Sequence, residues 1–405
     1  MALRDNLTAQ RAKRTKPRVY PIGVNLSWNS IPTRVKFSGV KAFAFEESWE
    51  LIRKVFPVDL EALARQSGSL CRARKVGDAE TLLRLLLMHG GGLSLEQTVR
   101  RAGQQGLGRL SAVALFKRLR RSAAFLQQLA CKVLEQVQQR APPVSWPGGY
   151  RFRLIDATTV KEPGPMGQCW RVHYSVRLPD LCCDHFEVTD LKAGESFKRW
   201  QAAADEVLLA DRAYAAREAV GALLDQGVKV VVRLNGRNFP LLSSPEAEQP
   251  FNLLAQLRTL QVGQVKDWQL YFRFGERSWP IRLCAVRKSR AAAERARRKA
   301  RAKARDEGRQ VQADTLELSE YLLVLTNLEP AAWSATNVLE LYRCRWQIEL
   351  AFKRLKGLLK LGHLPKKDPD SARAWLQLKL LLALITERLC EQARFFSPWG
   401  YRLEP

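Results

Sequence analysis

The chain is 405 residues long, a length typical of roughly two to three domains. Hydrophobic residues make up 46% of it, with 11 tryptophans among them, and this composition excludes a wholly disordered protein. Lysine and arginine number 67 against 40 acidic residues, a net charge of +27. So large an excess favours a polyanionic partner, because basic side chains displace counterions from phosphate backbones. An unusually basic protein without such a partner is the alternative.

The cysteines argue against a zinc site and for a reducing compartment. All eight are scattered without a CxxC pair, and only four histidines accompany them, so a zinc ribbon or finger does not fit. The N-terminus lacks the apolar segment of a signal peptide, and the most apolar helical stretch, Trp375 to Leu389, carries Lys379, Glu387 and Arg388. We therefore expect a cytoplasmic protein with no membrane partner.

Residues 1–44 are expected to form a basic arm and an extended segment. The first 18 residues hold six lysines or arginines against one acid, Asp5, a pattern that suits contact with a phosphate backbone. A solvated terminus is the alternative.

Residues 45–140 have the apolar spacing of a helical domain, for which we predict DNA binding. A buried helix covers 81–88, Ser94 with Gln97 forms a capping box for a second helix, and Ser111 begins a third. In this third helix we expect positions 113, 115, 116 and 119 to face the core, and a basic set to face outward: Lys117, Arg118, Arg120 and Arg121. A basic helix after a glycine-containing turn resembles a helix-turn-helix reader, and a plain bundle is the alternative.

A proline- and glycine-rich stretch at 141–149 marks a boundary, after which the pattern changes to strands. We predict helices at 193–204 and 213–226, and strands at 151–155, 170–178, 182–189, 207–210 and 228–234. This order over residues 150–235 is typical of an α/β layered domain.

Residues 236–320 interrupt that domain. They contain a predicted hairpin, at 268–274 and 278–286, and then a run from Arg287 to Arg309 with eleven basic residues and three acids. The alanines of this run favour a helix, and its charge favours contact with DNA over simple solvation.

The α/β pattern returns in residues 321–364. A strand is predicted at 320–328 and a long helix at 335–360. A last helix, at 370–394 within the segment 365–405, either covers the core or serves dimerisation.

One stripe of the long helix carries four polar side chains. Tyr342, Arg345, Glu349 and Lys356 fall within about 60° of one another on a helical wheel. A phenol, a guanidinium, a carboxylate and an ammonium do not form a core-facing stripe. Surface ion pairs explain Arg345 with Glu349, but they do not explain a polar stripe flanked by apolar residues.

This spacing resembles the Tyr-Arg-Glu-Lys signature of the insertion sequence 4 family of bacterial DDE transposases. Residues 154–159 are similar to the first-aspartate strand of that family, and 208–214 to its second-aspartate block, where glycine is commoner than Ala213. The stretches 170–174 and 186–190 resemble the two strands between these blocks. The resemblance covers residues 150–390.

The resemblance implies an α/β fold, with an RNase H-like mixed sheet and flanking helices, interrupted by a β-rich insertion and preceded by an all-α N-terminal domain. It implies Asp156, Asp211 and Glu349 as the catalytic, metal-binding triad. The residues agree, since both aspartates follow apolar strand runs and carboxylates are the hard ligands that suit two Mg²⁺ ions, or Mn²⁺ in their place. Four rival carboxylates rank lower because they lie in turns or polar stretches: Glu162, Asp184, Asp190 and Asp205.

The same resemblance implies that Tyr342, Arg345 and Lys356 hold phosphates of the transposon end. Their chemistry suits this role, because arginine forks onto phosphate oxygens and lysine acts as a point charge. Arg212, beside Asp211, either contacts DNA or neutralises the metal-site carboxylates.

In the family, the β-rich insertion carries a tryptophan that stacks on a flipped base near the cleaved end. Trp268 and Trp279 both lie in the predicted hairpin and are the candidates for this role. Simple packing is the alternative for each.

By resemblance, the chain is expected to cleave double-stranded DNA at transposon inverted-repeat ends and to join the freed 3′-hydroxyl to target DNA. A cut-and-paste route through a hairpin intermediate, a homodimer in a synaptic complex and association with the bacterial nucleoid are expected on the same ground. Two alternatives stay open: a catalytically inactive transposase-derived DNA-binding protein, and an RNase H-like endonuclease without strand transfer.

Overall fold

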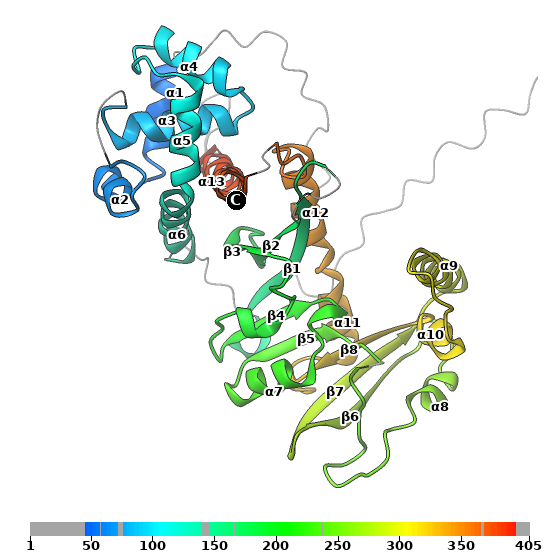
Figure 1. Cartoon of the computed structure of the whole chain (residues 1–405). Helices are drawn as coiled ribbons and strands as arrows, with labels where there is room; N and C mark the ends of the chain where they lie inside the picture. Colours follow the sequence, from blue (N-terminus) through cyan, green and yellow to red (C-terminus); the bar gives the residue numbers. More distant parts are fainter. Residues whose placement is uncertain are drawn as a thin grey trace, which may run out of the picture. The chain divides into compact units, whose positions relative to one another are not determined.

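The computed structural model describes residues 45–393, apart from 57, 72–75, 140–145, 165–166, 168, 237 and 366–367. The expected basic arm and most of the boundary expected at 141–149 lie outside the described residues. Helices and one eight-stranded sheet make up the part that is described (Figure 1).

The N-terminal region is helical, as predicted. Its helices are α1 (Phe45–Arg53), α2 (Leu60–Gln66), α3 (Ala79–Gly90), α4 (Leu95–Gln104), α5 (Ala112–Arg121) and α6 (Ala123–Gln139). The three individually predicted helices of this region correspond to α3, α4 and α5. The predicted capping box opens α4, because the Ser94 hydroxyl accepts the Gln97 amide and the Gln97 side chain accepts the Ser94 amide. The Ser111 hydroxyl likewise accepts the amide of Ala114 at the start of α5.

The last helix, α13 (Pro369–Ala393), packs among these N-terminal helices and contacts α3, α5 and α6. It approaches α3 at Gly90, where a Cβ atom would lie 2.7 Å from Cγ of Leu378, and Lys379 donates a hydrogen bond to the Gly90 carbonyl (2.6 Å). Of its two interpretations, the structure shows α13 covering a core. Within the described part of the chain, no helix is both long and apolar enough to span a bilayer.

The strands follow the order β3-β2-β1-β4-β5-β8-β7-β6. Their bounds are β1 (Arg151–Lys161), β2 (Cys169–Arg177), β3 (Cys183–Asp190), β4 (Glu206–Ala210), β5 (Lys229–Arg233), β6 (Val265–Phe274), β7 (Arg277–Arg287) and β8 (Tyr321–Thr326). β4 runs parallel to β1 and to β5, whereas every other neighbouring pair is antiparallel. This mixed sheet confirms the predicted α/β class. Its first five strands, in the order β3-β2-β1-β4-β5, have the arrangement of an RNase H-like core.

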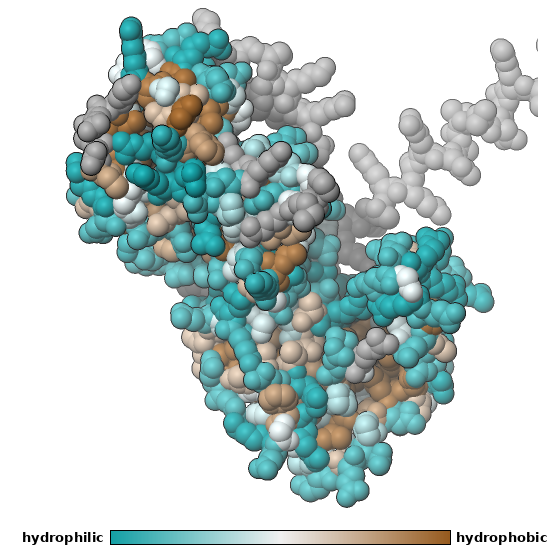
Figure 2. All heavy atoms as spheres, in the orientation of Figure 1, coloured by the Kyte–Doolittle hydropathy of each residue, from teal (hydrophilic) through white to brown (hydrophobic). Residues whose placement is uncertain are grey.

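The insertion extends this sheet. Its predicted hairpin is formed by β6 and β7, and β7 pairs with β8, which in turn pairs with β5. The helices of the insertion are α8 (Leu253–Arg258), α9 (Arg290–Asp306) and α10 (Ala313–Leu318), and α9 is the helix predicted for the basic run. Figure 2 shows a strongly hydrophilic surface over α9 and α10, at the right of the view.

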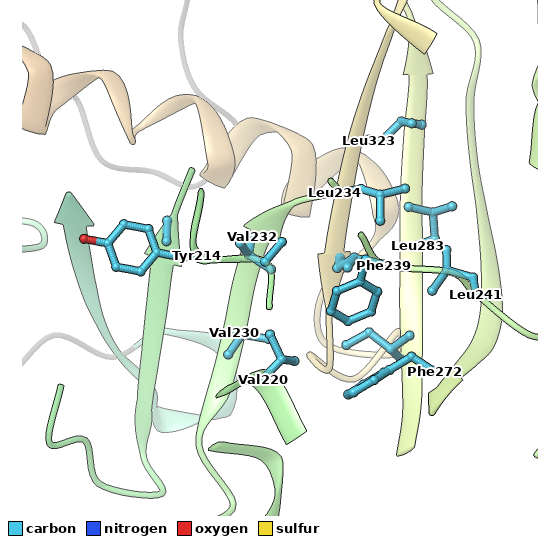
Figure 3. Close-up of a cluster of buried hydrophobic side chains, with 14 of the residues drawn as sticks. Tyr214, Val220, Val230, Val232, Leu234, Phe239, Leu241, Phe272, Leu283 and Leu323 are labelled. Carbon is cyan, nitrogen blue, oxygen red and sulfur yellow. The ribbon is translucent and has the colours of Figure 1, made fainter. Parts of the chain in front are cut away.

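Helices cover the sheet on both faces. One face carries a core cluster that includes Val220 of α7 (Arg217–Asp225), Val232 of β5 and Phe272 of β6, so the insertion shares its core with the parent domain (Figure 3). The other face is covered by α11 (Ala335–Arg343), which contacts β5 to β8, and by α12 (Trp346–Gly357), which contacts β1.

Two predicted helices differ from the structure. Residues 193–204 contain only a short 3₁₀ turn, η2 (Phe197–Arg199), because Phe197 and Trp200 are both buried in the core cluster and Trp200 takes an extended backbone. Tertiary packing here overrides local propensity. The long helix expected at 335–360 is divided into α11 and α12 by a tighter turn at Cys344 and Arg345, whose amides bond to the carbonyls three residues earlier.

The packing of α13 against the sheet predicts a pH-dependent stability. Glu387 accepts hydrogen bonds from the amide of Cys183 (3.2 Å) and the hydroxyl of Tyr174 (3.4 Å), and burial raises its pKa to about 7. The folded state favours the neutral acid of Glu387. Its ionisation therefore has no effect on stability below pH 4.5, the ordinary pKa of the group, and lowers stability progressively up to about pH 7, where the loss is complete.

We therefore expect Glu387→Gln, which mimics the neutral acid, to stabilise the protein above pH 7 by about 1–3 kcal/mol and to have little effect below pH 4.5. Denaturant unfolding of both proteins across this range measures the difference. An effect of the same size at both ends of the range would contradict the assignment.

Candidate active site

Asp156 and Asp211 leave the sheet at neighbouring positions. In the parallel pair β1–β4, Leu154 lies opposite Leu209, and each aspartate follows two residues later. Ile155, Leu208 and Ala210 point into the core cluster on the face of α7, so by strand alternation both aspartates point to the opposite face, where α11 and α12 pack.

The helices connect a third carboxylate, Glu349, to Asp156 through Arg345. The Tyr342 hydroxyl lies 3.4 Å from Oδ1 of Asp211, and Nη1 of Arg345 lies 3.5 Å from Oδ2 of Asp156. Arg345 also pairs through Nη2 with Glu349, one turn further along α12. Tyr342 and Arg345 therefore link three carboxylates from separate parts of the chain: Asp156 on β1, Asp211 after β4 and Glu349 on α12.

Lys356 completes the stripe at the far end of α12. Its Nζ donates to the carbonyl of Thr159 on β1 (3.2 Å). The polar stripe therefore faces β1 and the end of β4 along its whole length, despite the tight turn that separates the two helices.

Burial shapes the electrostatics of the site. The pKa of Asp156 is raised to about 6, chiefly by burial, although the Ala157 amide and Arg345 oppose the rise. Burial likewise raises the pKa of Tyr342, and the charge of Asp211 adds to the effect. Burial disfavours the ionised form of a carboxylate, and a nearby divalent cation would favour it.

Two residues near the candidate triad were not predicted from the sequence. Glu195 lies close enough to Asp156 and Asp211 to add to the rise in the Asp156 pKa, and its own pKa is raised by burial, with Arg171 opposing. It sits in an irregular segment where a helix is predicted, so no periodic pattern marked it. Trp346, beside Arg345, is 52% exposed, a large apolar surface that only the structure reveals.

The residues fit a divalent metal by their chemistry. Asp156, Asp211 and Glu349 offer only oxygen donors, as hard cations require. Arg345 lies between two of these carboxylates, and among the described residues no group of three or more His, Cys, Asp or Glu side chains is arranged to hold a metal ion.

The four rival carboxylates all have structural partners. Asp184 pairs with Arg153 (2.8 Å) and Asp205 with Arg151 (2.7 Å). The carboxylate of Glu162 accepts the indole N–H of Trp170, and that of Asp190 accepts the amides of Lys192 and Ala193.

The two tryptophans of the hairpin are packed to different degrees. Trp279 is only 9% exposed, stacks on Phe272 and donates its indole N–H to Asp225 (2.9 Å). Trp268 is half-buried, in edge contact with Phe251 and beneath the ammonium of Lys266. Base stacking stays a prediction for both, and the packing of Trp279 favours the structural interpretation.

The basic face of α5 differs from the prediction. Leu115 and Leu119 are buried as expected, but Val113 is 64% exposed. Arg120 pairs with Asp368 (3.0 Å) and Asp370 (3.3 Å) at the start of α13, and Arg118 donates to the Ser69 carbonyl. These two arginines hold the helical region together, whereas Lys117 and Arg121 are exposed.

Arg212 follows Asp211 directly and is exposed at the start of η3 (Arg212–Tyr214). It lines a basic pocket that also includes Arg233 and Asp211. This position is compatible with either role expected of it.

An RNase H-like sheet with carboxylates at adjacent strand ends and a third on a following helix defines a class of enzymes that cut polynucleotides. A family model described as "Transposase DDE domain" matches residues 187–385. The chain is 36% identical over 351 residues to InsL of insertion sequence element IS186A from Escherichia coli (strain K12), covering 84% of this chain and 93% of that protein. It is also 36% identical over 352 residues, with the same coverage, to the Escherichia coli transposase for insertion sequence element IS421.

The chain therefore belongs to the DDE transposases of insertion sequences, enzymes that cut and join DNA. Membership implies dependence on a divalent metal ion and action on transposon ends and target DNA.

Proposed function

We propose that Asp156, Asp211 and Glu349 are the catalytic triad of this transposase and that they hold two Mg²⁺ ions. The observation that carries the proposal is the chain of contacts in which Tyr342 touches Asp211 and Arg345 touches both Asp156 and Glu349. When bound, such a pair of ions activates the attacking oxygen and stabilises the leaving one.

The neighbouring side chains position DNA in this proposal. Arg345 carries five donors in a planar fork that suits a phosphodiester, and Tyr342 and Lys356 flank it along the same stripe. Lys117 and Arg121 of α5, with no ion pair among the described residues, add phosphate contacts from the helical region. The spacing of the stripe supports assigning the chain to the Tyr-Arg-Glu-Lys subgroup of the insertion sequence 4 family.

The subgroup suggests the remaining steps. Cleavage frees a 3′-hydroxyl, which attacks the other strand to form a hairpin and, once the hairpin is opened, attacks a target phosphodiester. Each attack forms one phosphorus–oxygen bond and breaks another. A homodimer in a synaptic complex on two inverted-repeat ends, acting at the bacterial nucleoid, completes the proposal.

Strand transfer is the decisive test. The protein is incubated with Mg²⁺, a plasmid target and a duplex that carries the terminal sequence of its element with a free 3′-hydroxyl. We expect duplex joined to plasmid, and the same reaction in EDTA should yield none while DNA binding persists. Nicked plasmid alone would indicate a nuclease without strand transfer, and binding without either product would indicate a catalytically inactive protein.

A further inference from the structure

A basic pocket of about 430 Å³ lies between the end of β5, the start of β8 and helices α9 and α10. It reaches Asp211, which is the only acid among its lining residues. Five cations line it: Arg212, Arg233, Lys288, Lys299 and Lys303. Most of the pocket belongs to the insertion, yet it ends at the candidate catalytic edge of the sheet.

The positive charge of the pocket is poorly compensated. Lys288 is half-buried, its Nζ donates to the carbonyl of Ser319 (2.6 Å), and burial together with Arg233 lowers its pKa to about 8. Glu320 pairs with Arg287 and Arg297, outside the pocket, and Glu307 pairs with the pocket residue Lys303 at 3.6 Å, so the acids offset only part of the charge. Among the described residues, Lys299 and Arg233 have no ion pair. Cations held close together in this way favour the binding of an anion.

Helix α9 is a fixed wall of this pocket. Its positions 296, 299, 300 and 303 share one face, so two lysines project beside two alanines that leave room between them. Ala293 and Ala304 are buried against the neighbouring elements, and Arg297 ties the helix to Glu320. The basic run is therefore an anchored helix.

We propose that this pocket binds backbone phosphates of the DNA strand that passes Asp211, one beside Lys299 and one beside Lys303. The inference rests on the proposed function, because it takes Asp211 as part of the catalytic site. A phosphodiester matches the pocket in charge, and the pocket is larger than a single phosphate, so it leaves space for the strand to continue toward the triad. Lys299 and Lys303 thus guide the strand but take no part in the chemistry.

The test compares two double variants of α9 that remove the same charge. Lys299→Ala/Lys303→Ala removes the two lysines that α9 contributes to the pocket lining. Arg298→Ala/Arg305→Ala removes two exposed arginines of α9 that do not line the pocket. Binding to the duplex that carries the terminal sequence of the element is measured as a function of salt. We expect the slope of log K against log salt to fall in magnitude by about 1.8 for the lysine pair, near 0.9 for each lost phosphate contact, and to change much less for the arginine pair.

Equal changes for the two pairs would show that α9 acts only as a diffuse basic surface, and no change for the lysine pair would also overturn the proposal. Lys299→Gln, a milder change, should lower the slope by about 0.9. Inorganic phosphate is added as a competitor: if it displaces no DNA at constant ionic strength but saturates the pocket lysines by NMR, the ligand is a free phosphate and the proposal fails. Thermal melts verify that all variants fold.

Failure of the proposed function remains distinguishable. If the parent chain joins DNA and Lys299→Ala/Lys303→Ala binds DNA with an unchanged salt slope, only the proposal that the pocket binds phosphate is contradicted. In the converse case, the parent chain makes no joined product while Lys299→Ala/Lys303→Ala lowers the salt slope of DNA binding. That result would support the pocket as a DNA contact and contradict the strand-transfer role.

Discussion

Asp156→Asn is expected to abolish DNA cleavage while binding of transposon ends stays within a few-fold of the parent protein. The change removes a carboxylate that would hold the metal, and it removes no phosphate contact. Loss of several kcal/mol of transition-state stabilisation corresponds to a rate at least about 10²- to 10³-fold lower. Gel assays of end cleavage and fluorescence anisotropy of end binding measure the two effects separately.

Asp205→Asn is the matched control. Asp205 is an exposed carboxylate that pairs with Arg151 near the start of β4, and an exposed pair of this kind contributes little to stability. Cleavage by this variant should match that of the parent chain. Full cleavage by Asp156→Asn would remove Asp156 from the triad.

Arg345→Ala is expected to weaken both binding and cleavage. Arg345 contacts Asp156 and Glu349, so its loss leaves two carboxylates facing the DNA without their cation. If the guanidinium also holds a phosphate, the salt slope of end binding should fall in magnitude by about 0.9. Arg345→Lys should recover the slope but less of the cleavage rate, because lysine keeps the charge and loses the fork.

Arg343→Ala serves as its control. Arg343 lies two residues earlier, is exposed and pairs only loosely with Glu340 (3.7 Å). Salt titrations of end binding for both variants make the comparison. An unchanged slope for Arg345→Ala would show that Arg345 does not touch the DNA backbone and acts only on its two carboxylates.

The elements that were predicted well depend on local signals. Short apolar runs between turn residues specified the strands, and the capping side chains of Ser94 and Ser111 specified two helix starts. The stripe from Tyr342 to Lys356 was visible because helical spacing places its members on one face, even though a tight turn interrupts the helix at Arg345.

Long-range packing accounts for what the sequence did not reveal. Nothing local indicates that Arg120 pairs with Asp368 and Asp370, some 250 residues away, or that Phe197 and Trp200 prevent a helix by packing in the core. The place of Glu195 beside the triad depends on that same irregular turn. Such features arise from the folded arrangement and leave no periodic pattern in the chain.

The position of α13 has a consequence for synthesis. Helices α3, α5 and α6 pack against a helix that the ribosome makes after every strand of the sheet. A nascent chain therefore holds an incomplete helical bundle, with the apolar surface that α13 covers exposed, until residues 369–393 have been made. Polypeptides terminated before residue 369 lack the helix that closes this bundle, so a frameshift before that residue would yield an unstable product.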